Sequence, residues 1–380
     1  MTTKSKRKSH RMLAHSVASS MLSDVLFGGV CSTNDDFTTI VKSSQDDTIS
    51  VTFCECFELE KKFAPKHQAS LLLAASYGRL GEAMKAMRVA DCGTFLEFAH
   101  AITDGVIDDK GMLHNANFCR DRLCPMCAWR RSYKIFAQVS QIMQRIGSSY
   151  KFIFLTLTVP SCAPDELVET LQRLFNAWTR LINRKAFKKA VRGFFRALEI
   201  TYNNNRRSKS YRTYHPHFHC ILAVPLDYAE SDLYISHDKW LDLWRECYKD
   251  DSITQVHVQF AHPKDSESED YADALKSAVA EVAKYSVKSK DYIIEGNEEL
   301  TDEIVSCLSS ALWHRRLSQF GGIFQKIALE LKLDDAEDGD LIHLTGDINS
   351  SLAYMIVRYG WSAGVYKMID SHILQPKSDE

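Results

Sequence analysis

The stretch His-Pro-His-Phe-His-Cys-Ile-Leu-Ala-Val, residues 215–224, decides how the central part of this chain folds. Its second half is apolar and rich in β-forming residues, and a proline ends the run, so we predict a strand over 217–224. Side chains point alternately to the two faces of a strand, so His215, His217 and His219 lie on one face. The opposite face carries the apolar side chains, and we expect it to meet a hydrophobic core.

Two of these histidines have the spacing of a metal site. His217 and His219 could bind one divalent ion, and Glu199, on the preceding predicted strand, would lie opposite them if the two strands form a hairpin. Two imidazoles and one carboxylate suit Mg²⁺ or Mn²⁺ and leave positions open for a phosphate oxygen. His257, on a later strand, is an alternative third ligand. In the competing interpretation, Glu199 is a buried acid that pairs with Arg196 or with a lysine.

Strands and helices alternate around this stretch in a recognisable order. Two-residue alternation and high β propensity predict strands, and apolar residues at helical spacing predict helices. The predicted strands are 152–159, 194–202, 217–224 and 253–260, and the predicted helices are 165–189, 236–248 and 269–288. The resulting β-α-β-β-α-β order is the split βαβ, ferredoxin-like pattern, so we expect an α+β fold with an antiparallel-rich sheet covered by helices on one face.

The last of these helices carries a second chemical motif. At about 100° per residue, an acid, two lysines and a tyrosine fall on one side of it and the apolar residues on the other. Tyr285 could attack a phosphate, Lys284 and Lys288 could stabilise the phenolate and phosphate charges, and Glu281 could accept a proton. Tyr292 lies on nearly the same side and is the alternative nucleophile. An ordinary amphipathic helix with a solvated face is the simpler interpretation.

Eleven cysteines are present, and three of them, Cys119, Cys124 and Cys127, follow the pattern C-x4-C-P-x-C. Cys92 lies 27 residues upstream of the first. Four thiolates would form a closed structural zinc site, in which His114 could replace one of them. Unrelated buried cysteines are the alternative. We expect no disulfides, because neither a signal peptide nor a membrane helix is evident and a reducing cytoplasm is the simplest setting.

The formal net charge of −2 conceals two basic clusters. Residues 180–212 contain eleven lysines and arginines and a single acid, and residues 120–134 contain five basic residues and one acid. A solvated face is the ordinary explanation of a basic run, but these runs bracket the chemical motifs and therefore favour a phosphate-binding surface. The arginines beside the cysteines would form a small DNA-gripping module. These arginines are Arg120, Arg122, Arg130 and Arg131.

Taken together and in this order, the motifs resemble those of the rolling-circle replication initiators of small bacterial plasmids, here of the single-tyrosine type, in the HUH endonuclease superfamily. The resemblance covers roughly residues 90–330. It rests on Cys-Arg-Asp-Arg-Leu-Cys-Pro-Met-Cys-Ala-Trp-Arg-Arg (119–131), Phe-Leu-Thr-Leu-Thr-Val-Pro (154–160), His-Pro-His-Phe-His (215–219), Glu-Val-Ala-Lys-Tyr (281–285), and Arg315-Arg316-Leu317 followed by Gly321-Gly322.

The resemblance implies a metal-dependent enzyme that nicks one DNA strand at a plasmid origin. Tyr285 would become joined to the 5′ phosphate and leave a free 3′-OH for a host polymerase, and the strand would later be closed. His217 and His219 correspond to the metal-binding HUH pair, with Glu199 as the third ligand. Glu281 stands where two-tyrosine relatives have their first tyrosine, and it would direct water in the terminating cut.

The implied partners are plasmid origin DNA, single-stranded at the nick, together with a host helicase and polymerase. No membrane partner is expected, and the expected location is the cytoplasm. An HUH transposase or a conjugative relaxase would use the same chemistry in another biological setting. A zinc-containing nucleic-acid-binding regulator without catalysis is an alternative of a different class.

The motifs divide the chain into four predicted regions. These are a poorly ordered N-terminal region (1–65), a helical, cysteine-rich DNA-binding segment (66–148), an HUH nicking domain (149–295) and a helical C-terminal accessory region (296–380). Further helices are predicted over 69–89, from the cysteines to Ile146, and, after an acidic linker, over 323–331 and 350–370.

Overall fold

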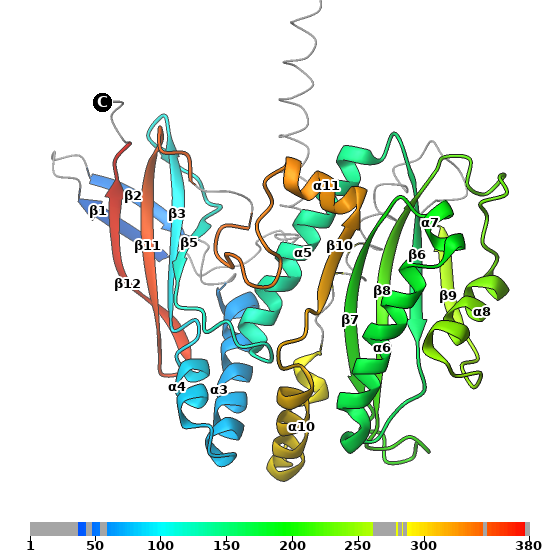
Figure 1. Ribbon diagram of the computed structural model, residues 1–380. Helices are drawn as coiled ribbons and strands as arrows, with labels where there is room; N and C mark the ends of the chain where they lie inside the picture. Colours follow the sequence, from blue (N-terminus) through cyan, green and yellow to red (C-terminus); the bar gives the residue numbers. More distant parts are fainter. Residues whose placement is uncertain are drawn as a thin grey trace, which may run out of the picture. The chain divides into compact units, whose positions relative to one another are not determined.

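The computed structural model of the chain describes residues 37–42, 48–53, 59–260, 279, 283, 287–344 and 348–376 (Figure 1). The chain divides into two units, Met1–Phe57 and Glu58–Glu380. In the first unit, β1 (Phe37–Lys42) pairs antiparallel with β2 (Thr48–Phe53). Both strands are rich in β-branched residues, which favour extended backbone. The polar composition around them predicts an irregular lead-in, so this strand pair is a feature that sequence reasoning missed.

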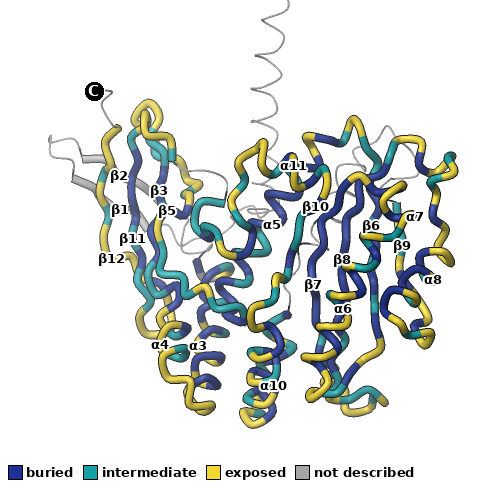
Figure 2. The backbone as a smooth tube through the Cα atoms, viewed as in Figure 1, coloured by how far each residue is buried: buried dark blue, intermediate teal, exposed yellow. Residues whose placement is uncertain are grey.

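A five-stranded antiparallel sheet in the second unit has the strand order β10-β7-β8-β6-β9. The four predicted strands are all present in it, and β10 joins as an edge strand that was not predicted. The strands are β6 (Lys151–Thr158), β7 (Gly193–Tyr202), β8 (Tyr214–Val224), β9 (Val256–Phe260) and β10 (Ser318–Gly322). β7 and β8 are buried along nearly their whole length (Figure 2), as expected for strands covered on both faces.

Two helices cover one face of this sheet, α6 (Leu167–Ile182) and α8 (His237–Tyr248) (Figure 1). The Trp178 ring packs edge-on against Phe218 of β8, at 5.9 Å between centroids. Ser236 caps α8 by accepting a hydrogen bond from Lys239 N. The helix predicted over 165–189 is present as η2 (Pro164–Glu166), α6 and α7 (Lys185–Ala190). The backbone is extended at Arg184, which separates α6 from α7. The predicted β-α-β-β-α-β order is nevertheless present.

A second sheet has the order β12-β11-β3-β4, with β5 also paired to β3. Its strands are β3 (Phe95–Thr103), β4 (Val106–Ile107), β5 (Met112–Ala116), β11 (Ala353–Ser362) and β12 (Val365–Leu374). The helix predicted over 350–370 is therefore wrong, and so is a wholly helical C-terminal region. Ala363 and Gly364 have φ values of 52° and 87°, and two consecutive positive φ angles form the tight turn that joins two strands with a right-handed twist.

Helices occupy the remaining described segments. The single helix predicted over 69–89 is two helices, because Gly81 lies between them with a φ of 79° and turns the chain. The helix predicted to end at Ile146 is confirmed. The acidic stretch that follows residue 296, predicted to be a linker, forms the helix α10 (Glu298–Ala311) instead. Asn297 caps this helix, and two glutamates lie in its first turn. The helices are η1 (Leu59–Phe63), α3 (Ala64–Arg79), α4 (Ala83–Ala90), α5 (Pro125–Ile146), η3 (Ser289–Asp291), α10 (Glu298–Ala311) and α11 (Ile323–Glu330).

Two glycines allow the edge strand β10 to approach β7 and then turn into α11. A Cβ added at Gly321 would lie 2.2 Å from the ring of Phe194. Gly322 has a φ of 58°, and a Cβ there would lie 2.3 Å from the carbonyl oxygen of Arg192. That same oxygen accepts a hydrogen bond from Ile323 N, at 3.0 Å. The two backbones are therefore held too closely for any side chain at position 322.

Replacing Gly322 by alanine should lower the free energy of unfolding by about 3 kcal/mol, because it combines a left-handed backbone penalty with a steric clash. Gly105→Ala is the matched control. Gly105 also has a positive φ, of 77°, but nothing lies within 4 Å of an added Cβ. Only about 1–2 kcal/mol is expected there. Urea unfolding followed by circular dichroism measures both losses, and equal losses would contradict the steric constraint.

Candidate functional site

The pairing of β7 with β8 brings one carboxylate and two imidazoles together. Glu199 lies directly opposite His217 in the register, and His219 is on the same strand face. His219 Nε2 lies 2.8 Å and His217 Nε2 lies 3.4 Å from Glu199 Oε2. The two Nε2 atoms are 3.1 Å apart. These ligand atoms are close enough to hold one metal ion, and the hairpin geometry predicted for Glu199 is confirmed.

Neighbouring atoms orient both imidazoles. His217 Nδ1 lies 3.1 Å from the carbonyl oxygen of His215. A carbonyl only accepts, so Nδ1 donates, and Nε2 is the nitrogen of His217 that faces Glu199. His219 Nδ1 lies 3.3 Å from the hydroxyl of Thr156, which is its opposite residue on β6. The Nε2 atoms of both rings therefore face Glu199, which is where the ligand nitrogens of a metal-binding histidine pair must lie.

Glu199 is a buried carboxylate with an unusual number of cationic or polar partners. Burial alone would raise its pKa, but its contacts with His217, His219 and Lys288 hold the pKa well below its usual range. Lys288 Nζ lies 2.9 Å from Glu199 Oε1. The competing interpretation of Glu199 is therefore right about a lysine partner, although that lysine shares the carboxylate with two histidines.

Arg196 is not a partner of Glu199, because it projects from the opposite face of β7. Its guanidinium lies over the rings of Phe175 and Phe218, at 4.9 and 4.6 Å from their centroids. This burial lowers the pKa of Arg196 to about 10. Arg196 therefore belongs to the core beneath α6, whereas Glu199 points toward the histidines.

The alternative site residues lie elsewhere. His257 is exposed and lies opposite Thr156 on β9, so Thr156 and its strand separate it from His219. The Tyr292 side chain is 1% exposed, and its hydroxyl donates to the carbonyl of Leu123. A buried phenol in such a bond is a poor nucleophile toward DNA. The predicted helix over 269–288 carries Tyr285 and three charged residues on one side. Of these, the structure describes Lys288, whereas Glu281, Lys284 and Tyr285 lie outside the described residues.

The four predicted cysteines form a second cluster in which all sulfur atoms lie within 4.8 Å of one another. Cys92 follows α4, and the other three precede or begin α5. Cys92 Sγ is 3.5 Å from both Cys124 Sγ and Cys127 Sγ. Backbone N–H groups point at the sulfurs, for example Arg120 N at 3.2 Å from Cys127 Sγ. Such N–H···S bonds stabilise thiolates that hold a metal.

The chemistry of this cluster fits a divalent cation. Contacts with the neighbouring sulfurs, together with burial, raise the pKa of Cys92 and Cys119. Four crowded thiols therefore resist losing their protons together unless a cation offsets the charge. His114 is not part of the cluster, and its ring lies against His343 instead, at 6.1 Å. No described cysteine is in a disulfide.

The arginines beside the cysteines make hydrogen bonds within the protein. Arg130 is buried, and its guanidinium donates to the carbonyls of Leu341 and Ile342 at 2.8 and 2.9 Å. Arg131 donates to Glu337 O and Asp121 O. Arg122 and Arg120 donate to the carbonyls of Arg315 and Asp338, respectively. The DNA-gripping role of these four arginines stays a prediction, and the bonds show a structural role. Arg120, Arg130 and Arg131 hold the segment that follows α11 against α5 and the cysteine-bearing loop before it.

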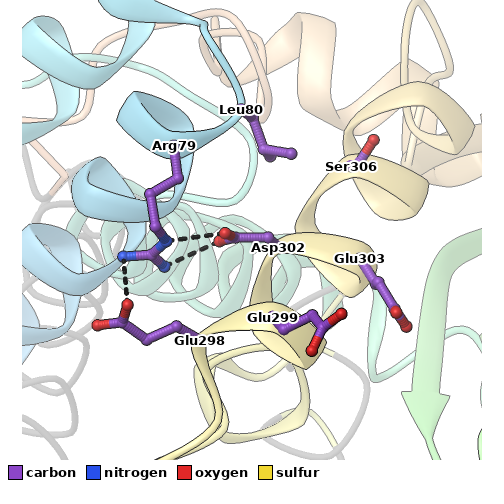
Figure 3. A pocket seen from close by; sticks show the side chains of 7 residues that line it. All are labelled: Arg79, Leu80, Glu298, Glu299, Asp302, Glu303 and Ser306. Carbon is purple, nitrogen blue, oxygen red and sulfur yellow. Dashed lines mark hydrogen bonds and ion pairs between the residues drawn. The ribbon is translucent and has the colours of Figure 1, made fainter.

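Two open cavities lie apart from these clusters. One cavity of about 640 Å³ lies between the end of α3 and α10 (Figure 3). Arg79 spans it and pairs with Asp302 and Glu298. Acidic side chains from α10 dominate its wall, so it is unsuited to bind a phosphate backbone. The lining residues are Arg79, Leu80, Glu298, Glu299, Asp302, Glu303 and Ser306.

Comparison with known proteins decides the family. A family model described as "Replication protein" matches residues 110–366. The chain belongs to this replication-protein family. It is 37% identical over 273 residues to a "Protein rep" of a Bacillus species, covering 69% of this chain and 85% of that protein. It is also 36% identical to a "Protein rep" of Bacillus amyloliquefaciens, over 75% of this chain and 84% of the relative.

A third relative, a "Protein rep" of Staphylococcus aureus, is 37% identical over 248 residues. The match covers 64% of this chain and the whole length of that relative. The resemblance to replication initiators that rests on the motifs is confirmed at the level of this family. No solved structure matches the chain. Within the described ranges, no helix combines the length and apolar character needed to span a bilayer.

Sequence reasoning overlooked two neighbours of the replication protein's clusters. Thr156 is one of them, because its hydroxyl contacts His219 Nδ1. Its position on β6, opposite His219, is the signal that a strand register would have given. Glu337 was also missed. It is buried, accepts hydrogen bonds from Ser318 N and Oγ at 2.5 and 3.0 Å, and lies 3.4 Å from Arg122.

Arg130→Ala should lower the free energy of unfolding by about 3 kcal/mol, because one buried and one partly buried carbonyl lose their charged donor. Arg145→Ala is the control on the same helix, where the side chain is exposed, and a change below about 0.5 kcal/mol is expected. Binding of a single-stranded oligonucleotide by folded Arg130→Ala should match that of the parent. Weaker oligonucleotide binding by Arg130→Ala, with unchanged stability, would instead indicate that Arg130 contacts DNA.

Proposed function

We propose that this replication protein initiates rolling-circle replication of a plasmid by nicking one strand at the origin and joining Tyr285 to the 5′ phosphate. One observation carries the proposal. Lys288 bonds to Glu199 within the Glu199, His217 and His219 cluster. Lys288 follows Tyr285 by three residues, so chain connectivity keeps their Cα atoms within roughly 11 Å of each other. The tyrosine is thereby tethered beside a candidate metal centre.

The sheet supports the same proposal. The order β7-β8-β6-β9, with α6 and α8 as the helical crossings, fits the ferredoxin-like split βαβ arrangement. The nicking core on this proposal is residues 149–295. The two imidazole nitrogens and the carboxylate within it would hold Mg²⁺ or Mn²⁺. When bound, such an ion supplies positive charge to the non-bridging oxygens of a phosphate.

The tyrosine carries out the strand transfer. Its phenol oxygen attacks phosphorus, a P–O bond to Tyr285 forms, and the bond from phosphorus to the 3′ oxygen breaks. Glu281 takes the phenol proton, and the leaving 3′ oxygen takes a proton from solvent and becomes a free 3′-OH. Lys284 and Lys288 stabilise the phenolate and the phosphate charge. In the terminating cut, Glu281 directs water, after which the strand is closed.

The partners follow from this chemistry. Origin DNA must be single-stranded at the nick, because the phosphate must reach a tyrosine and a metal centre at once. The free 3′-OH is the primer that a host polymerase extends, and a host helicase would separate the strands in the cytoplasm. A transposase or a relaxase would share the chemistry, but the similarity of the chain to replication proteins favours initiation.

Tyr285→Phe should abolish covalent attachment, because it removes the attacking oxygen. The probe is a labelled single-stranded oligonucleotide library of random sequence, incubated with the full chain and Mn²⁺ and analysed on a denaturing gel. The parent should form an adduct that a chelator prevents, and the variant should form none while still binding DNA. Tyr292→Phe is the matched control and should form the adduct. An adduct that persists in Tyr285→Phe would refute the proposed nucleophile.

The four cysteines are proposed to hold a structural zinc ion. Elemental analysis of the purified chain should find about one zinc per molecule, the number expected for one closed four-thiolate site. Cys127→Ser should lose the metal and unfold more readily, because such sites contribute folding free energy directly. Cys307→Ser, outside the cluster, should keep the metal. Full zinc occupancy in Cys127→Ser would contradict the assignment.

A further inference from the structure

The basic run over residues 180–212 is divided by the fold into two separate groups. β7 runs through its middle and, with ten residues, separates its ends by roughly 33 Å. Lys185, Lys188 and Lys189 lie on α7, before the strand. A second group follows the strand in residues 203–213, the loop that joins β7 to β8. The two groups cannot serve one short segment of DNA together.

Only the second group lies near the metal cluster. Glu199 is four residues before Asn203, the first residue of the loop, which corresponds to about 13 Å along an extended strand. Four nucleotide steps of a B-form strand, at about 3.4 Å each, span a similar length. The loop also returns directly into β8, which carries His217 and His219. DNA held by the loop would therefore be within a few nucleotides of a phosphate at the metal cluster.

The loop is internally organised, and Asn203 is at the centre of this organisation. Its side-chain nitrogen donates to Ser208 Oγ and Ser210 Oγ, at 3.0 and 2.8 Å. Its side-chain oxygen accepts from Asn205 N at 2.9 Å. The Asn205 side chain in turn accepts from Arg207 N at 3.0 Å. A loop held in this way loses little conformational entropy when it binds a ligand.

Three cations on the loop face solvent. Arg206, Arg207 and Lys209 are exposed, and in the described part of the chain no carboxylate lies in an ion pair with them. Residues 203–213 contain no acid. Arg212 differs, because it pairs with Glu303 of α10 and is thereby committed to the protein. Three uncompensated charges on a rigid loop form a site for a polyanion.

We infer that the β7–β8 loop binds the phosphates of single-stranded DNA that flanks the nick, through Arg206, Arg207 and Lys209. The inference rests on the proposed nicking function for its position relative to the metal cluster. Single-stranded rather than duplex DNA is the ligand, because a flexible strand can follow the short path from the loop to the buried Glu199, His217 and His219.

The test measures binding without cleavage. The full chain is titrated with a labelled oligothymidylate of about 20 nucleotides, long enough to span such a site, in chelator and at several salt concentrations. The triple variant Arg206→Ala, Arg207→Ala, Lys209→Ala should bind about tenfold more weakly at low salt, and its salt slope should be less negative by about 2, since each single-strand contact contributes about 0.7.

The matched control is Lys185→Ala, Lys188→Ala, Lys189→Ala, which removes the same charge from α7 at the other end of β7. It should bind oligothymidylate like the parent. An equal loss in both triple variants, or an unchanged salt slope in the loop variant, would overturn the inference. So would a loss confined to duplex DNA of the same length.

A further variant and the adduct assay separate this inference from the proposed function. Asn203→Ala leaves all three charges in place but removes the scaffold, and it should weaken binding with an unchanged salt slope. If the parent forms the Tyr285 adduct and the loop variant binds normally, only the loop assignment fails. If the parent forms no adduct while the loop variant still loses binding, the nicking function fails and the DNA contact stands.

Discussion

The antiparallel register of β7 and β8 is the constraint on which the candidate site depends. It places Glu199 opposite His217 and directs both residues to the same face of the sheet. A slip of one residue would turn every side chain of one strand to the other face and separate the carboxylate from the imidazoles. Large apolar side chains on the α6 face, such as Phe218 and Leu198, fix this register, because they are fully buried only in one alignment. The chemistry on one face is thus specified by packing on the other.

Burial of Glu199 then determines its surroundings. A buried carboxylate is costly unless charge and hydrogen bonds compensate it. Here two imidazoles and the ammonium group of Lys288 do so. Lys288 follows Tyr285 by three residues in the sequence. Its ion pair with the buried Glu199 therefore holds this point of the chain beside the sheet. One ion pair therefore links the metal cluster to the part of the chain that carries the proposed nucleophile.

The basic residues of the chain have divided roles that charge alone does not reveal. Those around the cysteine cluster donate to carbonyls of the segment after α11, and Glu337 of that segment bonds to Ser318 on β10. Through these contacts, α5 and the cysteine cluster are joined to the edge of the sheet that bears Glu199. The basic side chains of the β7–β8 loop, apart from that of Arg212, are in no ion pair among the described residues. The same residue type is structural in one place and available to a ligand in the other.

The sequence by itself determined the elements with clear periodicity. These are the four strands of the central sheet, α8 and α5, the pairing of Glu199 with the histidines, and the gathering of four cysteines. Each depends on local alternation, on a cap or on short-range spacing, which a single sequence carries. The tertiary structure alone decided the rest. The strands β11 and β12, the roles of the arginines and the burial of Tyr292 depend on partners far away in the chain, such as β3 for β11 and Leu123 for Tyr292. Local propensity cannot encode such contacts, because the free energy that selects them comes from burial against a distant segment.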